Sequence, residues 1–399
     1  MIVPFVEAML LLIGIVLLVP VAVLLIEILS ALVLPPRRES DGVSARRPRV
    51  AVLIPAHDEE TGIAATLASV RPQLATGDRL LVVADNCSDQ TAAVAAAAGA
   101  EVVERRDLER RGKGYALDCG VRRLEADPPE AVVMIDADCE LHPGSLDRLA
   151  RLCIAADRPV QALDLMHAPA GAGLKTRLAE FAWLVKNQVR PLGAMNLGLP
   201  CQLMGTGMAF PWPMIRGAPL ATGHIVEDMR LGLDLAAAGA APRFCPAARV
   251  TSLFPVGTQG EAEQRSRWER GHVGVIVHEA PGALLRALVR RRPALAAMVL
   301  NLAVPPVTML MLMLVVQAVV DGGFAALTGR VYPLAVALSA LALLVASVAA
   351  AWARYGRHVV SLRDLASAPL YVIAKLPLYA RFLARTPGEW VRARRDERR

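Results

Sequence analysis

The sequence predicts an α/β domain with a doubly wound, mostly parallel sheet that is inserted between transmembrane helices. Hydrophobic residues make up 55% of the chain, but their distribution is more informative than their number. Short apolar, β-branched runs alternate with helical patterns within a long polar region, roughly residues 37 to 290. Nearly uninterrupted apolar stretches flank that region on both sides. The first pattern predicts the sheet and the second predicts the membrane segments.

The alternation begins with a run that we expect to end at Pro55. The runs that predict strands are 49–54, 80–84, 101–104 and 131–135. The patterns that predict helices are 60–71, 90–98, 115–126 and 229–238. Strands that alternate with helices of this length favour a parallel sheet. In such a sheet, ligands bind beyond the carboxyl ends of the strands.

Three apolar stretches are long enough to cross a bilayer, which requires about 20 apolar helical residues. They run from Ala8 to Leu34, from about Pro293 to Val320 and from about Pro333 to Trp352. The first is too long for the core of a signal peptide and has no basic start, so we expect a retained anchor. The second contains Pro305-Pro306, which would kink a helix. Neighbouring helices can still provide hydrogen-bond partners for the carbonyl groups that the kink leaves free.

The basic residues predict the orientation of these spans. Arginines follow the first span, precede the second and follow the third, whereas the loop between the last two carries only Arg330. The positive-inside bias therefore places the polar region and the C-terminus in the cytoplasm of an integral plasma (inner) membrane protein. A further stretch, Leu365 to Leu383, contains Lys375 and Arg381 and is predicted to lie in the membrane interface. The net charge of +7 comes largely from these flanks. Nucleic-acid binding is disfavoured, because no platform of aromatic residues accompanies the basic ones.

These boundaries divide the chain into five predicted segments. They are an N-terminal anchor (1–36), a cytoplasmic domain (37–262), interfacial helices (263–292), two transmembrane helices (293–353) and an interfacial segment with a basic tail (354–399).

Polar clusters follow three of the predicted strands, as AHDEE (56–60), DNCSD (85–89) and DADCE (136–140). Because parallel strands end at one edge of a sheet, we expect these clusters to lie together. Asp136 and Asp138 alternate along an extended segment, so both carboxylates can face one point. Such a pair suits Mg²⁺ or Mn²⁺ shared with a substrate diphosphate, although it could also form a turn that caps the next helix.

Other positions combine a chemical hypothesis with a structural alternative. Lys113, in a Gly-Lys-Gly turn, could contact a phosphate or remain solvated. Asp228, with Glu227 beside it, could remove a proton from an acceptor hydroxyl or cap the helix that follows. In QRSRW (264–268), the arginine could bind a diphosphate and the tryptophan a sugar or lipid, or the segment could be an interfacial basic-aromatic helix.

Taken in order, these segments resemble the membrane-embedded branch of the family 2 inverting glycosyltransferases. That branch includes cellulose, chitin, hyaluronan and poly-N-acetylglucosamine synthases and ceramide glucosyltransferase-like enzymes. The resemblance covers roughly residues 49 to 275. Its motifs are IPAHDEE (54–60), ADNCSDQT (84–91), GKGYALDCG (112–120), DADC (136–139), GTGMAF (205–210), VEDMRLGLDL (226–235) and QRSRW (264–268). One departure is Asp58, which stands where many members of the family have Asn.

The resemblance implies a GT-A-like fold and transfer of a sugar from a nucleotide-diphosphate donor, with UDP as the favoured nucleotide. It implies that Asp138 binds the metal and that Asp228 is the general base, with Glu227 beside it. The residues that it implies in donor binding are Ala56, His57, Glu59, Asp85, Lys113, Asp136, Gln264, Arg267 and Trp268. Attack on the face opposite the leaving diphosphate would invert the anomeric configuration.

The acceptor stays open between a lipid-linked molecule and a growing polysaccharide, as in exopolysaccharide biosynthesis. Three spans are few for one chain to enclose a polysaccharide channel, so a homo-oligomer or an export partner is also considered. The alternative function is a membrane-tethered nucleotide-binding module without catalysis, which would lack a base or a metal ligand. An oxidoreductase is disfavoured because no GxGxxG follows the first strand, and a transporter because the polar signals lie outside the spans.

Overall fold

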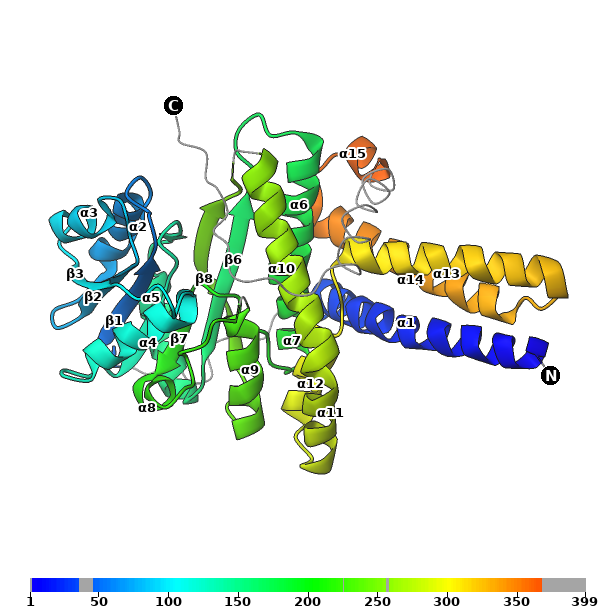
Figure 1. Ribbon diagram of the computed structural model, residues 1–399, viewed down its shortest axis with the longest axis horizontal. Coiled ribbons are helices and arrows are strands. Elements are labelled where there is room, and N and C mark those ends of the chain that lie inside the picture. The colour runs from blue at the N-terminus through cyan, green and yellow to red at the C-terminus, as the bar shows by residue number, and fades with distance from the viewer. Residues whose placement is uncertain (1, 36–45, 225, 256–257, 368–399) are drawn as a thin grey trace.

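The computed structural model describes residues 2–35, 46–224, 226–255 and 258–367, with only the backbone described from 258 to 267. The described residues form one eight-stranded sheet with the strand order β3-β2-β1-β4-β7-β6-β8-β5. The strands are β1 Val50–Ala56, β2 Arg79–Asp85, β3 Glu101–Arg105, β4 Ala131–Met134, β5 Glu140–Leu141, β6 Val160–His167, β7 Met208–Pro211 and β8 Arg243–Leu253. A bundle of long helices projects from the far side of this domain (Figure 1).

The sheet is mixed but mostly parallel, which confirms the predicted fold class. Strands β1 to β4 are parallel to one another, and β7 runs antiparallel to both of its neighbours, β4 and β6. The first strand continues through Pro55 to Ala56, so the prediction that it ends at Pro55 was wrong. Proline is tolerated at position 55 because β4 ends at Met134, which pairs with Leu53. The N–H that Pro55 lacks would therefore lie beyond the last pair of these two strands.

Helices cover both faces of the parallel half of the sheet. Alternate residues of β1 point to opposite faces, with Val52 on one side and Leu53 on the other. The first face packs against α2 Ile63–Val70, α3 Thr91–Ala97 and α5 Ser145–Ala156. The second face packs against α4 Lys113–Leu124, α8 Trp212–Arg216 and α9 Glu227–Ala238. This two-layered cover explains why the predicted strands are almost wholly apolar.

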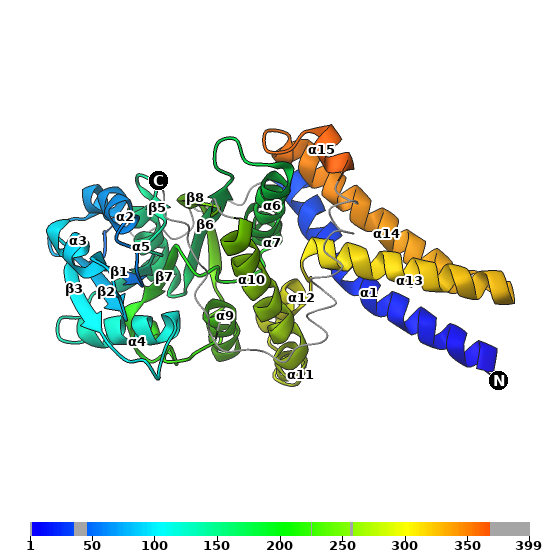
Figure 2. The ribbon, with the colours of Figure 1, turned by 45° about the horizontal axis from the view of Figure 1, so that its top comes forward.

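A second group of helices lies between the sheet and the projecting bundle (Figure 2). One continuous helical segment beside β6 consists of α6 Leu174–Leu184, a π-helical turn Val185–Val189 and α7 Arg190–Asn196. The others are α10 Thr258–His278, α11 Ala280–Val289 and α12 Pro293–Leu302. In Figure 1, α10, α11 and α12 run across the direction of the bundle.

Three helices in the described part of the chain are long and apolar enough to cross a membrane, which indicates membrane association. They are α1 Ile2–Val33, α13 Val307–Thr328 and α14 Tyr332–Ala351, the last continuing as a π-helical turn to Gly356. The apolar stretch from Pro293 to Val320, expected to be one kinked helix, is divided between α12 and α13. Pro305 and Pro306 interrupt it because they lack N–H donors and disfavour helical geometry in the residues before them.

The last helix in the described part of the chain is the short helix α15, Leu362–Ala366. Most of the segment predicted to lie in the interface, Leu365 to Leu383, and the whole basic tail fall outside the described residues.

Polar contacts fix α1 to the domain that it anchors. The carboxylate of Glu27 pairs with Arg190 of α7 at 2.6 Å and accepts a hydrogen bond from Asn301 of α12 at 2.6 Å. Both Glu27 and Arg190 are buried, so each charge depends on the other. The helices approach so closely that a Cβ on Gly193 would lie 1.8 Å from the carbonyl oxygen of Glu27. The C-terminal half of α1 is therefore packed as part of the domain.

Candidate active site

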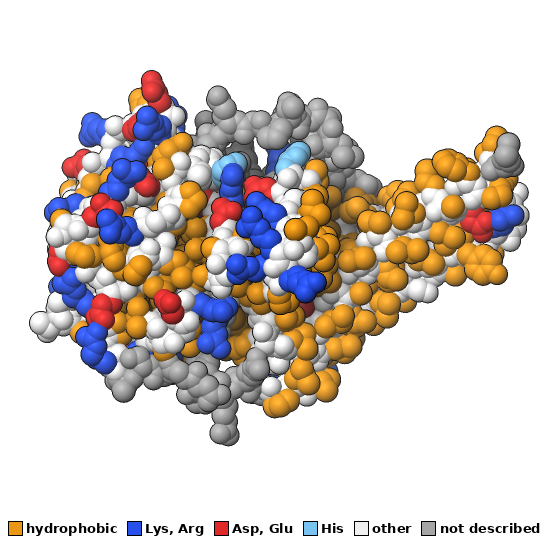
Figure 3. Space-filling model, turned by 90° about the horizontal axis from the view of Figure 1, so that it is seen from below, with side chains coloured by type: hydrophobic (Ala, Val, Ile, Leu, Met, Phe, Trp, Pro, Cys, Tyr) orange, Lys and Arg blue, Asp and Glu red, His pale blue; other side chains and the backbone are white. Residues whose placement is uncertain are grey.

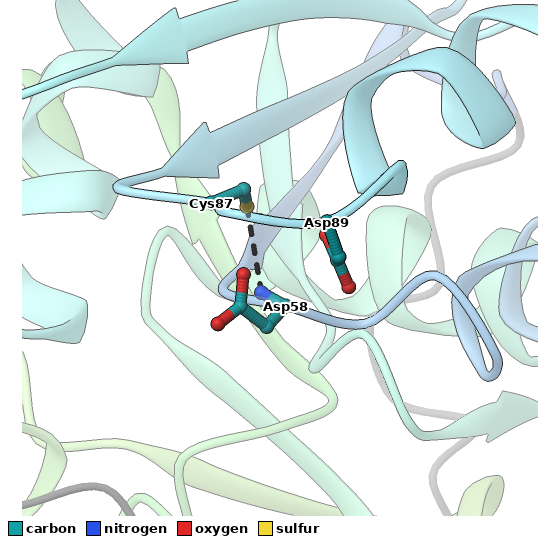
Figure 4. A group of neighbouring side chains, drawn as sticks. All are labelled: Asp58, Cys87 and Asp89. Atoms are coloured by element: carbon teal, nitrogen blue, oxygen red, sulfur yellow. Dashed lines mark hydrogen bonds between the residues drawn. The ribbon is translucent and has the colours of Figure 1, made fainter.

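The loops that follow β1 and β2 are joined by hydrogen bonds from backbone amides to carboxylates. Asp58, at a positive φ of 52°, accepts a bond from the amide of Ser88 at 2.6 Å. Asp89 accepts one from the amide of Glu60 at 3.1 Å. The amide of Asp58 lies 3.4 Å from Sγ of Cys87 (Figure 4). These contacts hold both loops in fixed positions at the carboxyl edge of the sheet.

Asp58, Cys87 and Asp89 are also close enough to form a metal site, since one ligand atom from each lies within 4.8 Å of the others. Two observations favour a structural role instead. Both carboxylates already accept amide hydrogen bonds. Burial also raises the pKa of the Cys87 thiol, and a thiol is a softer ligand than the oxygen atoms that Mg²⁺ and Mn²⁺ prefer.

The same edge holds four residues of the predicted donor site: Ala56, His57, Glu59 and Asp85. Nδ1 of His57 lies 2.7 Å from the carbonyl oxygen of Asp85. The buried carboxylate of Asp85 pairs with Arg105 at 2.6 Å, and that guanidinium lies over the ring of Tyr115 at 5.5 Å. Ala56 is buried, and the amide of Glu59 donates to Thr91. The structure thus brings these four residues together, and it pairs Asp85 with an arginine that sequence analysis did not identify.

A second cluster forms where α4, α9, the end of β4 and the turn before β7 meet. Lys113 forms an ion pair with Asp136 and lies 4.0 Å from the carboxylate of Glu227. The Lys113 ammonium also donates a hydrogen bond to the carbonyl oxygen of Gly205 at 2.9 Å. The amide of Asp136 donates to Oγ1 of Thr206 at 3.1 Å. Residues that are far apart in the sequence therefore form one site beyond the strand ends, as expected for a doubly wound sheet.

Asp228 lies next to this cluster on the first turn of α9. A Cβ built on Gly205 would lie 3.5 Å from Oδ2 of Asp228 and 3.5 Å from Nζ of Lys113. Gly205 has a positive φ of 88°, a backbone conformation that favours glycine. Asp228 and Glu227 together line a small pocket with Thr222. Asp228 thus faces the same space as the Lys113–Asp136 pair.

Burial determines the electrostatics of this cluster. It raises the pKa of Asp136 and of Asp228, and it raises the pKa of Glu227 to about 8. Burial alone would lower the pKa of Lys113, but the nearby carboxylates of Asp136 and Glu227 outweigh it and raise that pKa. The carboxylates outnumber the ammonium group here, so the site favours the binding of an additional cation.

Sequence analysis missed the polar groups that β6 and the π-helical turn add beside this cluster. Asp164 of β6 is 2% exposed, accepts a hydrogen bond from Asn187 at 2.9 Å, and has its pKa raised to about 8 by burial. Burial lowers the pKa of Lys186, whose Nζ lies 5.1 Å from the ring centroid of Trp183. The signal was the polar run KNQVR (186–190) within an apolar helix, and π-helical turns are frequent at functional sites.

The QRSRW segment lies on α10, and the structure describes only part of it. The side chains of Gln264 and Arg267 fall outside the described side chains. Trp268 packs against Trp183 with ring centroids 5.1 Å apart, and Trp183 meets Phe254 edge to face at 6.4 Å. This aromatic group links α10 to the end of α6, directly before the π-helical turn that carries Lys186.

Asp138 lies beyond Asp136 on the same loop and is exposed. Two carboxylates with hard oxygen atoms match the ligands that Mg²⁺ and Mn²⁺ prefer. Among the described residues, no third ligand completes a cluster with this pair. Such an arrangement fits a cation that takes its remaining ligands from a substrate diphosphate and from water.

A mostly parallel sheet with an acidic pair beyond its fourth strand, flanked by apolar helices, defines the GT-A class of nucleotide-sugar glycosyltransferases. Residues 48–271, more than half of the chain, match the family described as Glycosyltransferase like family 2. The chain belongs to this family and is a glycosyltransferase.

Similar proteins support this assignment. An uncharacterised glycosyltransferase of Mycobacterium tuberculosis is 40% identical over 192 residues, which are 45% of this chain and 82% of the relative. Glucosyl-3-phosphoglycerate synthase of Mycolicibacterium paratuberculosis is 33% identical over 215 residues, covering 46% of this chain and 61% of that enzyme. A mannosyltransferase from Pyrobaculum calidifontis, solved with GDP-Man and Mn²⁺, has a TM-score of 0.53 at 19% identity. That likeness covers 86% of this chain and 99% of the mannosyltransferase, and it shows the fold alone.

Proposed function

We propose that this chain is an inverting glycosyltransferase that uses a nucleotide-diphosphate sugar, with UDP as the favoured nucleotide. Its acceptor is a lipid-linked molecule or a growing polysaccharide at the membrane, as in the membrane-embedded branch of the family. The observation that carries the proposal is the cluster of Lys113, Asp136, Glu227 and Asp228 beyond the strand ends. The names of two relatives, a glucosyl transferase and a mannosyltransferase solved with Mn²⁺, support sugar transfer with a divalent metal.

Asp136 and Asp138 are the proposed residues that hold Mn²⁺ or Mg²⁺ with the donor diphosphate. Once bound, the cation supplies positive charge that offsets the charge developing on the leaving diphosphate. Lys113 contributes to the same end, because its ammonium is held between carboxylates at the position where the cation and diphosphate would lie. The nucleoside is proposed to bind along the loops that carry Ala56, His57, Glu59 and Asp85.

Asp228 is the proposed general base. Its carboxylate accepts a proton from the acceptor hydroxyl while the oxygen of that hydroxyl bonds to the anomeric carbon of the donor sugar. The bond from that carbon to the diphosphate breaks, and the electron pair leaves with the nucleotide. Attack from the face opposite the diphosphate inverts the configuration, so an α-linked donor gives a β-linked product. Glu227 lies beside the base, and burial together with the charge of Asp228 raises its pKa to about 8.

The acceptor is proposed to approach from the side of α10. Trp268 and Trp183 provide flat apolar faces for a sugar or a lipid there. Gln264 and Arg267, on the same helix, are proposed to contact the diphosphate and acceptor. The observation that favours a membrane-bound acceptor is that this helix belongs to the group between the sheet and the long helices (Figure 2).

The proposed location is the plasma membrane, with the sheet domain in the cytoplasm and the five predicted segments retained, except that the second span begins at Val307. Charged side chains gather over the sheet domain, whereas the projecting bundle is almost wholly hydrophobic (Figure 3). Helix α11 supports an interfacial position, because Ala283 and Ala287 are buried while Leu285 and Leu288 are 63% and 65% exposed. Large apolar side chains that point outward beside small buried ones are expected where lipid replaces water.

The test is a donor panel with the full chain in lipid nanodiscs. The donors supplied with Mn²⁺ or Mg²⁺ are UDP-glucose, UDP-N-acetylglucosamine and GDP-mannose. The lipid and polymer products are identified from their masses by mass spectrometry. We expect metal-dependent transfer from one donor, with release of its nucleotide diphosphate. Absence of transfer and of donor hydrolysis across the panel would contradict the proposal. Nucleotide binding without turnover would favour the alternative of a non-catalytic binding module.

A further inference from the structure

The turn that approaches the proposed base is held by a residue outside the seven motifs. Gln161 lies on β6, opposite Met208 of β7, and its side chain is fully buried. Its Oε1 accepts a hydrogen bond from the amide of Met204 at 2.8 Å. Its Nε2 donates to the carbonyl oxygen of Thr206 at 2.8 Å. One amide side chain thus bonds to both ends of the turn 204–206.

This turn touches three groups of the proposed active site. The carbonyl oxygen of Gly205 accepts the hydrogen bond from Lys113, and Oγ1 of Thr206 accepts the one from the amide of Asp136. Asp228 lies on the other side, because a Cβ on Gly205 would be 3.5 Å from its Oδ2. The turn therefore lies between the base and the Lys113–Asp136 pair.

Little space remains for the turn to adopt another position. Gly207, at a positive φ of 65°, lies so close to β6 and β8 that a Cβ would be 2.8 Å from side-chain atoms of Ala162 and Val250. On the other side of the turn, Nε2 of Gln202 donates to the carbonyl oxygen of Met298 on α12 at 2.8 Å. The turn is thus fixed both to the sheet and to a helix next to the membrane bundle.

We propose that Gln161 is a positioning residue for sugar transfer, holding the turn 204–206 at the distance that the reaction requires between Asp228 and the Lys113–Asp136 pair. This inference rests on the roles proposed above for those three residues. The position requires an amide, because one group must accept from Met204 and donate to Thr206 at the same time. A methionine would leave two buried backbone groups unpaired, and an ionised glutamate would place a negative charge against a carbonyl oxygen.

The experiment compares Gln161→Met and Gln161→Glu with the same changes at Gln73. Gln73 is a matched control because its amide also bridges backbone groups, donating to Ser69 and Leu141 at 3.0 Å each and accepting from Leu146 at 3.2 Å. It lies in a different pocket, with Glu140 and His142. All four variants are prepared as full chains in nanodiscs, and turnover is expressed per UDP-binding site, so that loss of folded protein does not count as loss of catalysis.

We expect the Gln161 variants to lose about 10- to 100-fold in kcat per binding site, with the donor KM changed far less, because a small misplacement of reacting groups has an effect of this order. Hydrogen exchange measured by mass spectrometry should rise in the peptide around residues 201–207 in these variants only. Turnover per site equal to that of the Gln73 variants, or unchanged exchange in that peptide, would overturn the inference. An inactive wild-type chain would instead contradict the proposed function, and the exchange measurement would still decide whether Gln161 holds the turn.

Discussion

Two acidic clusters lie at the carboxyl edge of the same sheet, and they differ in what satisfies their carboxylates. Asp58 and Asp89 accept hydrogen bonds from backbone amides, and these bonds hold two loops together. Asp136 and Glu227 instead face a lysine, and Asp228 lies across from that lysine at Gly205. The first carboxylates join two loops and stabilise the structure, whereas the carboxylates gathered around Lys113 have pKa values raised by burial and can exchange a proton or bind a cation.

The comparison shows that the density of acidic residues in a sequence does not identify the reactive site. AHDEE is as acidic as DADCE, with three acidic residues each, and DNCSD has two, yet in the structure only DADCE meets Lys113. Substitutions in the two clusters should therefore have very different effects on transfer. The predictions below test that contrast in order of decreasing effect.

Replacing Asp228 by Asn should reduce the rate of transfer by about 10²- to 10⁴-fold, which is the usual contribution of a general base. The amide keeps the size of the side chain, so binding of UDP with Mn²⁺ should change little. Asp157→Asn is the control, because Asp157 is exposed at the C-terminal end of α5, where its left-handed backbone conformation also suits asparagine. Initial rates and isothermal titration with UDP measure both quantities. Equal loss of transfer and of binding would indicate a structural role for Asp228.

Replacing Lys113 by Met should reduce turnover by about 100-fold, since a preorganised charge in an active site contributes an effect of this size. The change removes the counter-charge of Asp136 and Glu227. Nucleotide affinity should fall as well, in contrast to the Asp228 variant. The control is Lys175→Met, because Lys175 is exposed at the start of α6. A Lys113 variant with normal turnover would remove the main distinction between the two clusters.

The stability of the metal-free protein should depend on the protonation of Glu227. Burial raises its pKa from 4.5 to about 8, so the folded state favours the protonated form. The stability that this carboxyl group contributes is therefore complete below pH 4.5 and is lost as the pH rises through about 8. Glu227→Gln should flatten the fall of the melting temperature across this range. Thermal unfolding in the presence of a chelator measures the effect, and an unchanged slope would contradict the assignment.

The smallest effect is expected in the cluster that joins the loops. In Asp58→Asn, the side-chain oxygen can still accept the hydrogen bond from Ser88, so transfer should stay within about twofold of wild type. Asp58→Ala removes the acceptor and should lower the free energy of unfolding by about 1–3 kcal/mol. Chemical denaturation and initial rates test the pair. A large loss of transfer in Asp58→Asn would mean that this cluster also takes part in the chemistry.

The parallel half of the fold was predictable from the sequence, and the other half was not. Strands β1, β2 and β4 are covered on both faces, so each is a mostly apolar run that can be recognised without a structure. Strand β6 contains the buried polar residues Gln161 and Asp164, which interrupt such a run. Both are satisfied by partners distant in the sequence, Met204 and Asn187, and such pairings are visible only in three dimensions.

The site was predictable to a similar extent. Asp136, Lys113 and Asp228, which the motifs assign to one site, lie near one another in the structure, because each begins or follows an element at the same edge of the sheet. The carboxylate partners of Lys113 depend on the packing of α9 against α4 and the sheet, which spacing along the chain does not determine. Lys186 and Asn187 were missed because they lie within an apolar helix that carries no motif of the family.

The central claim is that the cluster around Asp228 transfers a sugar by a single displacement. The most direct measurement is the anomeric configuration of the product formed from an α-linked donor, obtained by proton NMR of the isolated glycoside. The account predicts a β-linked product, formed by wild type and lost in Asp228→Asn. An α-linked product from the wild-type chain would contradict it, because retention cannot arise from one attack on the face opposite the leaving diphosphate.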